Sequence, residues 1–279
     1  MTDREIFFEI TNICNHKCIH CCKQWEDNSS GRTASMKTLD KILDIPKSHL
    51  TISGGEPSLV KEKVFYLIKR EKCTMSINTN LTNWDKHDIN IFNKKNNLEL
   101  NISVVSLQRN IYQKVTLANT FDKFFSNLRL VNKHNTFITM VANDVNFDSI
   151  DFTIQTLILL GFKNILLTPQ VPTPNLYIDT KKVINKVNDL HSKYANTANI
   201  TTQGFCDTVY CDHTCNAGIG RLLIDTKGNV YPCAPIHKPC KLGTINTDIN
   251  ILKERGKDFY NSYPQESRKI CKGFLDLKI

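Results

Sequence analysis

The stretch FFEITNICNHKCIHCC, residues 7–22, runs from an apolar strand-like segment into a loop that carries three regularly spaced cysteines. Cys14, Cys18 and Cys21 follow the pattern C-x3-C-x2-C. Three thiolates on a cube of four irons leave one iron open to a further ligand, whereas four cysteines close the site. Zinc is the alternative, because it prefers four ligands and either histidine of the loop could supply the fourth. The segment therefore predicts an iron–sulfur or zinc site after the first strand.

A second strand-like run ends in TISGGEP, residues 51–57. Two glycines at the end of a strand let the backbone approach a ligand closely. Together with the cysteine pattern, this motif resembles the radical S-adenosylmethionine (SAM) enzymes over residues 6–168. The resemblance implies that the cysteines hold a [4Fe–4S] cluster whose open iron is chelated by the amine and carboxylate of SAM. It assigns further cofactor contacts to Gly54, Gly55, Glu56 and Pro57.

The resemblance also places cofactor-binding residues at the ends of later strands. Thr79 and Asn80 match the family stretch after the third strand, whereas Leu81 stands where the family usually has glycine. Asn78 or Thr79 is expected to reach the ribose or carboxylate of SAM. Ser106 and Asn143 occupy similar positions after the fourth and fifth strands. We therefore expect Asn78, Thr79, Ser106 and Asn143 near SAM.

The fold class follows from alternation along the chain. Segments with helical period, such as the stripe Phe121, Phe124, Phe125 and Leu128, separate short β-rich runs. The expected strands are residues 6–10, 50–53, 73–78, 98–105, 137–142 and 164–167. About six strand–helix units predict an α/β fold with a parallel sheet covered by helices. The family resemblance implies a partial (β/α)6 barrel, in which chemistry gathers at the carboxyl ends of the strands.

The rhythm changes after residue 167, and we expect a barrel core in residues 1–167 and a small second domain in residues 168–279. The second domain begins with a proline-rich linker at residues 168–175, followed by one helix. A hairpin is predicted from residues 221–225, a turn that contains Gly228, and residues 230–231.

The C-terminal cysteines resemble an auxiliary cluster module. Cys215, Gly228 and Cys233 form the pattern C-x12-G-x4-C, which is similar to the opening of the SPASM and twitch modules. The usual terminal cysteine pair is incomplete, because Phe274 stands at the second position. The resemblance implies one auxiliary [4Fe–4S] cluster, with a structural or zinc site as the alternative. The expected ligands are Cys215, Cys233, Cys271 and either Cys211 or Cys240.

Composition narrows the setting in which this chemistry would take place. The 279 residues are 41% hydrophobic and 23% charged, with a net charge of +9. The N-terminus lacks the pattern of a signal peptide, and no apolar run approaches the roughly 20 residues that span a bilayer. Eleven cysteines, an odd number, in a chain with no export signal favour metal ligation or thiol chemistry over disulfides. We expect a cytoplasmic protein with a basic surface and no membrane partner.

The resemblance implies a reaction class. Reductive cleavage of SAM would give a 5′-deoxyadenosyl radical that abstracts a hydrogen atom from the substrate, with an electron donor such as flavodoxin or ferredoxin. Cys22 and Cys206 are candidate hydrogen donors. The expected substrate is a ribosomally made peptide that is crosslinked or epimerised. The alternative is oxidation of a small alcohol or amino sugar by a twitch-type dehydrogenase.

An alternative of another class is a zinc-binding nucleic-acid module. The basic charge permits it, but aromatic residues do not alternate with basic ones as in stacking platforms. It would also make the cysteine triplet and the GGEP motif coincidental.

Overall fold

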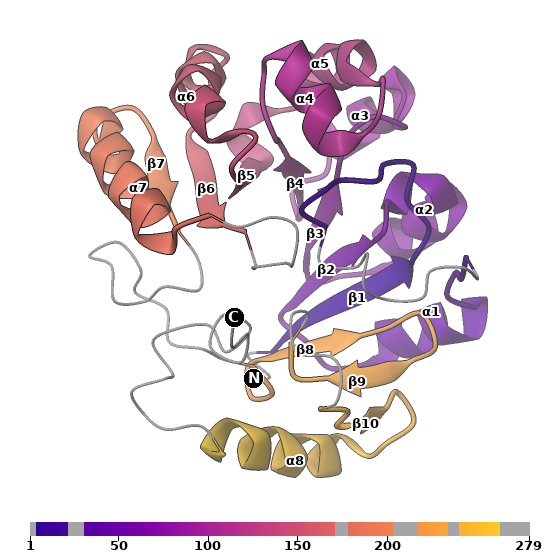
Figure 1. Cartoon of the computed structure of the whole chain (residues 1–279). Helices are drawn as coiled ribbons and strands as arrows, with labels where there is room; N and C mark the ends of the chain where they lie inside the picture. Colours follow the sequence, from indigo (N-terminus) through magenta and orange to yellow (C-terminus); the bar gives the residue numbers. More distant parts are fainter. Residues whose placement is uncertain (1–3, 22–30, 171–177, 203–216, 234–239, 263–279) are drawn as a thin grey trace.

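The computed structural model describes residues 4–21, 31–170, 178–202, 217–233 and 240–262. Within these ranges the strands form one sheet in the order β10-β9-β8-β1-β2-β3-β4-β5-β6-β7 (Figure 1). All pairings from β8 to β7 are parallel, and β8-β9 and β9-β10 are antiparallel. The strands are β1 (Glu5–Thr11), β2 (His49–Gly54), β3 (Thr74–Thr79), β4 (Leu98–Ser103), β5 (Thr136–Ala142), β6 (Asn164–Pro169), β7 (Asn199–Thr201), β8 (Arg221–Ile224), β9 (Asn229–Tyr231) and β10 (Gly243–Thr244).

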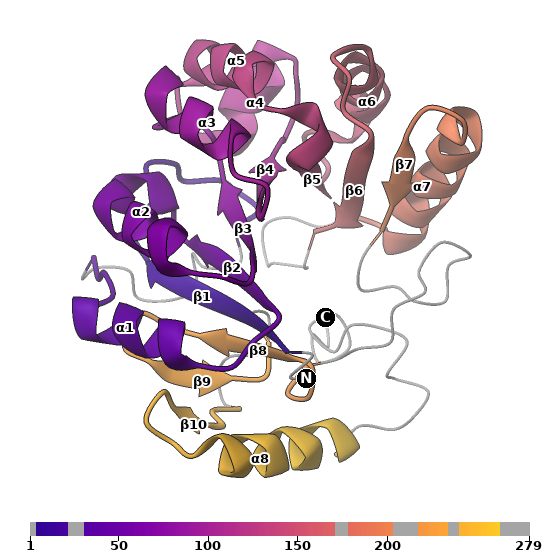
Figure 2. The ribbon, with the colours of Figure 1, turned by 180° about the vertical axis from the view of Figure 1, so that it is seen from behind.

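Helices cover the outer face of the curved sheet, as both views show (Figures 1 and 2). The helices are α1 (Met36–Asp44), α2 (Lys61–Arg70), α3 (Lys86–Asn93), α4 (Arg109–Thr116), α5 (Phe121–Leu130), α6 (Ile150–Leu159), α7 (Thr180–Tyr194) and α8 (Ile249–Asn261). Short 3-10 turns lie at Pro57–Val60, Lys133–Asn135 and Phe147–Ser149. The α/β fold with a mostly parallel, open sheet confirms the predicted class and is compatible with a partial barrel.

The core lies between the strands and the helices. Along β1, Ile6, Phe8 and Ile10 are fully buried against the same cluster as the helix residues Leu39 and Val64. Alternate residues of a strand point to opposite faces, so the other residues of β1 face the concave side of the sheet. None of the helices in the described ranges is long and apolar enough to cross a membrane.

The concave face is polar. His49 of β2 contacts Thr74 and Ser76 of β3 through its two ring nitrogens, at 2.9 and 3.0 Å. Ser76 Oγ lies 2.9 Å from Thr51 Oγ1. Burial lowers the pKa of His49, so this side chain is neutral at pH 7. The inner surface therefore offers hydroxyl and imidazole groups rather than an apolar lining.

The predicted C-terminal hairpin is present, and it extends the main sheet. β8 pairs in parallel with β1, in the register Glu5↔Arg221 to Phe8↔Ile224. Gly228 has φ +79° in the turn, a backbone conformation that suits glycine. The domain boundary at residue 168 remains a prediction, since the sheet runs without a break into the C-terminal region. Residues 168–169 of the predicted linker belong to β6, and most of the remainder lies outside the described residues.

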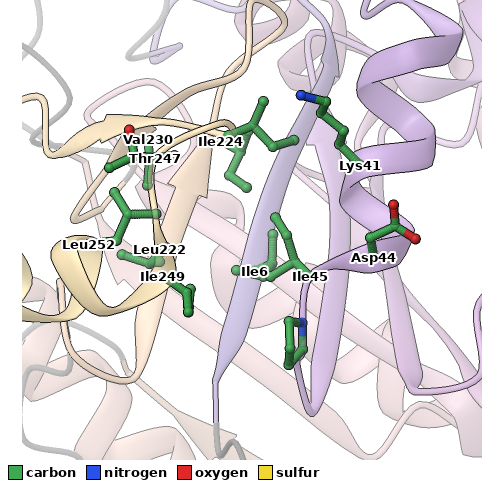
Figure 3. Close-up of a pocket in the computed structure, with 12 residues that line it drawn as sticks. Ile6, Lys41, Asp44, Ile45, Leu222, Ile224, Val230, Thr247, Ile249 and Leu252 are labelled. Atoms are coloured by element: carbon green, nitrogen blue, oxygen red, sulfur yellow. The ribbon is translucent and has the colours of Figure 1, made fainter.

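A cleft of about 240 Å³ lies on the outer side of β1, between α1 and the hairpin with α8 (Figure 3). Ile6, Leu222, Ile224 and Leu252 give it apolar walls. Charged side chains are present only toward α1 among the residues that line it. The cleft faces away from the concave side, because Ile6 is one of the core-facing residues of β1.

Candidate active site

The loop that carries the three cysteines, residues 12–21, follows β1 at the carboxyl ends of the parallel strands; we call it the cysteine loop. It continues the pairing of β1 with β2 past the end of both strands. Gly55 N donates to Thr11 O at 2.7 Å, and Glu56 N donates to Ile13 O at 2.8 Å. The two sequence motifs therefore lie in direct backbone contact.

The two glycines of the second motif make this contact possible. A Cβ atom at Gly54 would lie 2.1 Å from Thr11 O, and one at Gly55 would lie 2.1 Å from Ile13 O. Gly54 also has φ +138°. The sequence predicted that the glycines admit a ligand, and in the structure they admit the backbone of the cysteine loop. Their Cβ side is thus occupied by the chain itself.

Glu56, a residue that is 1% exposed, joins the ends of β2 and β3 through its carboxylate. Oε1 accepts hydrogen bonds from Thr79 Oγ1 at 2.7 Å and Ser58 N at 3.0 Å. Oε2 accepts one from Asn80 N at 2.7 Å. Burial raises the pKa of Glu56, and these hydrogen bonds oppose that shift. The carboxylate is therefore committed to the protein, as are the N–H groups of Gly55 and Glu56, which donate to the backbone of Thr11 and Ile13.

Thr79 and Asn78 are also held within the protein. Thr79 Oγ1 accepts hydrogen bonds from Trp84 Nε1 at 2.9 Å and Leu81 N at 3.0 Å. Asn78 donates to Ser53 Oγ at 3.3 Å and accepts from the side chain of a β4 asparagine at 3.0 Å. Leu81 has φ +66°, so the position where the family usually has glycine keeps a backbone conformation that suits glycine.

Ser106 and Asn143 are fully buried at the ends of β4 and β5. Ser106 Oγ accepts a hydrogen bond from Gln108 N at 3.1 Å. Asn143 Oδ1 accepts from Val145 N at 3.0 Å and Asn146 N at 3.2 Å, whereas its Nδ2 has no partner among the residues that the structure describes. A buried amide donor without a partner is costly, so Asn143 is the predicted residue best placed to bind a ligand. Pro57 is buried and begins the short turn before α2.

A polar network that the sequence did not predict holds the other side of the cysteine loop. Asn15 donates to Thr82 Oγ1 at 2.9 Å and accepts from Asn80 Nδ2 at 2.8 Å. His16, which the sequence offered as a zinc ligand, contacts Thr120 through Nε2 at 2.9 Å. The one feature of the sequence that could have indicated this network is the position of Asn15 and His16 between the first two cysteines.

Burial affects two of the three thiols on the cysteine loop. Burial raises the pKa of Cys14, and burial with the nearby Cys21 and Cys14 raises the pKa of Cys18 to about 12. The thiols of Cys14 and Cys18 would therefore release protons when a cluster binds. The six described cysteines form no disulfide.

A site for a single metal ion needs several ligands directed at one point. In the described ranges, no three or more His, Cys, Asp or Glu side chains surround the position of one metal ion. The three thiolates of a [4Fe–4S] cube each bind a different iron and need not converge on one point.

Cys233 follows β9 and Cys240 precedes β10, and both are half-buried. Several predicted site residues fall outside the described residues. These are Cys22, Cys206, Cys211, Cys215 and Cys271. The composition of an auxiliary site and the hydrogen donors therefore remain predictions.

Comparison with known proteins agrees with this geometry. A family model described as the Radical SAM superfamily matches residues 8–157. The GTP 3′,8-cyclase of Vibrio cholerae serotype O1 is 29% identical over 130 residues, which cover 43% of this chain and 39% of that protein. The enzyme of the same name from Vibrio vulnificus is 28% identical over 134 residues. The chain thus spans well under half of the length of these curated relatives.

Solved structures share the fold. Streptococcus suis SuiB bound to S-adenosylmethionine has a TM-score of 0.71 and 16% identity, over 89% of this chain and 63% of that one. The protein anSMEcpe, with bound AdoMet and the Kp18Cys peptide, has a TM-score of 0.72 and 18% identity, over 91% of this chain and 82% of that one. At these identities the likeness shows the fold alone.

Proposed function

Because the chain belongs to the radical SAM superfamily, we propose that it cleaves SAM reductively and uses the resulting radical to modify a ribosomally made peptide. Membership of the family makes the protein an enzyme and implies a [4Fe–4S] cluster and SAM. It thereby removes the alternative of a zinc-binding nucleic-acid module. When bound, the cluster and SAM supply a 5′-deoxyadenosyl radical that removes a hydrogen atom from an unactivated carbon.

The observation that carries the proposal is the contact between the cysteine loop and residues 54–56. Cys14, Cys18 and Cys21 would hold the cluster, and residues 54–56, which two backbone hydrogen bonds join to β1 and the loop, would lie beside the bound SAM. The unpartnered Nδ2 of Asn143 would donate to SAM across the same end of the sheet. The closed polar networks around Glu56 keep these groups in place without reorganisation.

Iron and sulfide per chain, measured after anaerobic reconstitution, test the first step. We expect about eight irons in the wild-type chain and about four in the Cys14/Cys18/Cys21→Ala variant. The variant should form no 5′-deoxyadenosine from SAM under reducing conditions. Zinc without iron in the wild-type chain would overturn the proposal. About four irons in the wild-type chain and none in the variant would mean that the cysteine loop holds the one cluster and that the auxiliary cluster is absent.

We place the auxiliary cluster at the other end of the sheet. β9 runs antiparallel to β8, so Cys233 lies toward the amino end of β1, while the cysteine loop follows its carboxyl end. Six residues of extended chain separate the levels of Glu5 and Thr11, which corresponds to roughly 20 Å. A substrate on the concave face would lie between the two sites, and Cys233 with its partner cysteines would hold a cluster able to accept an electron from it. A Cys233→Ala variant should lose about half of the iron and keep SAM cleavage.

The peptide substrate is supported by the fold shared with a structure of SuiB bound to the precursor peptide SuiA, which has a TM-score of 0.69. A short peptide encoded beside the gene for this chain is the probe for this step. Mass spectrometry after incubation with SAM and a reductant such as flavodoxin or ferredoxin should show loss of a pair of hydrogens for a crosslink. Deuterium uptake from D2O without another change would indicate epimerisation. No change in the peptide, with SAM cleavage intact, would overturn the substrate assignment.

One observation favours a second candidate, oxidation of a small alcohol or amino sugar. The concave face between β2 and β4 carries a chain of hydrogen-bonding side chains, from His49 and Ser76 to Asn78 and Asn101. Such a lining suits a substrate with several hydroxyl groups better than an apolar side chain. A panel of amino sugars that stimulates 5′-deoxyadenosine formation more than the peptide does would select this candidate.

A further inference from the structure

The side chain of His16 ties the cysteine loop to a fixed group of aromatic rings. His16 Nε2 and the Tyr112 hydroxyl lie 2.9 and 3.0 Å from the same atom, Thr120 Oγ1. His16 is 7% exposed and Tyr112 2% exposed. Tyr112 meets the His16 ring edge-on at 6.1 Å and stacks on Phe124 at 5.2 Å. Closely packed aromatic rings have few alternative positions, so they fix the place of the imidazole.

The backbone of the same loop docks on the end of α4. Lys17 N donates to Thr116 O at 3.1 Å, and Ile19 N donates to Val115 O at 2.9 Å. The last carbonyl groups of a helix have no hydrogen-bond donors within the helix. Here two N–H groups of the cysteine loop donate to two of these carbonyl groups. These bonds hold the loop on both sides of Cys18. At the start of the loop, Glu56 N holds Ile13 O and Thr82 holds Asn15, and the His16 ring adds an anchor between Asn15 and Lys17.

The start of the loop contains a hydrogen bond to a ligand sulfur. His16 N–H donates to Cys14 Sγ, with an N···S distance of 3.4 Å. Hydrogen bonds to the sulfurs of an iron–sulfur cluster are among the factors that set its reduction potential. A donor directed at the sulfur stabilises the extra negative charge of the reduced cluster and so raises the potential. Because the ring and the N–H belong to one residue, a fixed ring also fixes the direction of the N–H.

We propose that His16, Thr120 and Tyr112 form a clamp that holds the His16 N–H on the Cys14 sulfur and raises the reduction potential of the cluster. His16 is a positioning residue, since it acts through Cys14. The inference rests on the proposed function, because it requires a cluster on the cysteine loop. It assigns a role to the side chains of His16, Thr120 and Tyr112.

The experiment compares reconstituted full-length variants by two measurements. One is the midpoint potential of the electron paramagnetic resonance signal that is absent from the Cys14/Cys18/Cys21→Ala variant. The other is the rate of iron release to a ferrous chelator. We expect His16→Leu and Thr120→Val each to shift the potential to more negative values and to release iron roughly tenfold faster. The double variant should show no further change, because both substitutions break the same contact.

Rescue and control variants separate this role from packing. His16→Gln places an amide near the position of Nε2, and we expect it to restore both measurements. Tyr112→Phe keeps the contact between His16 and Thr120 and should give a smaller shift. Thr136→Val is the matched control: its buried hydroxyl donates to Asn132 O at 2.7 Å at the start of β5, far from the loop. It should lower the melting temperature without changing the potential.

Two results would overturn the inference. Wild-type potential and iron release in His16→Leu and Thr120→Val, with a lowered melting temperature, would make His16 a packing residue only. A wild-type chain that takes up no iron would overturn the proposed function together with the clamp. The first result leaves the proposed function intact, so the two failures are distinguishable.

Discussion

The cysteine loop packs on the end of β2, and α8 packs on the turn before β8, in each case through two glycines but in different surroundings. Gly54 and Gly55 admit the cysteine loop, as described above. At the hairpin, Gly218 and Gly256 meet, and a Cβ at Gly256 would lie 1.8 Å from Gly218 O. Each contact brings two backbone segments closer than any larger residue permits.

What surrounds each contact differs. Around the cysteine loop, side chains such as Asn15, Glu56 and Asn80 close a network of hydrogen bonds. Beside the hairpin and α8, the cleft of about 240 Å³ remains against α1. Directional hydrogen bonds surround the first contact, whereas an apolar cavity remains beside the second. Precision is therefore concentrated where the predicted chemistry takes place.

The largest expected effect on stability concerns the end of α1, a helix that lines the cleft on one side and packs on the core on the other. Lys47 Nζ lies 2.7 Å from Glu71 Oε2, both side chains are buried, and Lys47 also donates to carbonyls at the end of α1. Lys47→Met would leave the carboxylate buried without its partner and should cost about 3–5 kcal/mol of unfolding free energy. Urea unfolding measures this cost, and Lys41→Met, within α1, is the control. An equal loss in both variants would show that α1 is held by its apolar face alone.

The same ion pair predicts a pH dependence. Burial raises the pKa of Glu71, but hydrogen bonds from Lys47 and from backbone N–H groups outweigh it, so the pKa is lowered from 4.5. A lowered carboxyl pKa gives stability that is present above pH 4.5 and is lost as the pH falls through the folded value. The difference in unfolding free energy between the wild type and Lys47→Met should therefore become smaller as the pH is lowered. A constant difference from pH 7 to pH 4 would contradict this account.

Alanine at the two glycine contacts compares the regions directly. Gly55→Ala and Gly256→Ala each place a methyl group against a backbone carbonyl, and each should cost about 1–3 kcal/mol. Only Gly55→Ala should also lower iron retention on the cysteine loop, because it displaces Ile13 beside Cys14. Iron analysis with thermal melting distinguishes the two. Equal iron loss in both variants would break the distinction between a precise and a tolerant attachment.

Filling the cleft should stabilise the hairpin side. Ile249 begins α8 and lines the cleft (Figure 3). Ile249→Phe adds apolar volume there and should raise the unfolding free energy by about 0.5–1 kcal/mol. No change in cluster content is expected. A loss of stability would mean that the cleft is too narrow for the ring and that this attachment is also closely packed.

The smallest effect is expected at Leu117, which ends α4 beneath the cysteine loop. It has φ +51° and its side chain is 60% exposed. Leu117→Gly removes strain at little cost in buried area, and should raise stability by about 0.5 kcal/mol after the entropy cost of glycine. Differential scanning calorimetry measures the change in stability. The control is Leu159→Gly, at an exposed leucine at the end of α6, which should lower the stability.

Sequence patterns predicted what depends on short spacing. The six predicted strands correspond to β1–β6, and the hairpin around Gly228 is present, because alternation and turn residues are local signals. The contacts that define the site are not local. Glu56 meets Asn80 across 24 positions, and His16 meets Thr120 across 104. No spacing rule predicts such partners, and the same is true of the parallel pairing of β8 with β1.

That pairing has a consequence for the order in which the protein is made. Arg221 and Glu5, joined side by side across β8 and β1, are 216 positions apart. At the usual rate of synthesis, β1 leaves the ribosome roughly 10–40 s before its neighbour exists. During this interval one edge of the nascent sheet is unpaired and open to strands of other chains. The first strand to be synthesised is thus among the last to gain both neighbours, so yield in a cell depends on how well this edge is protected while translation is completed.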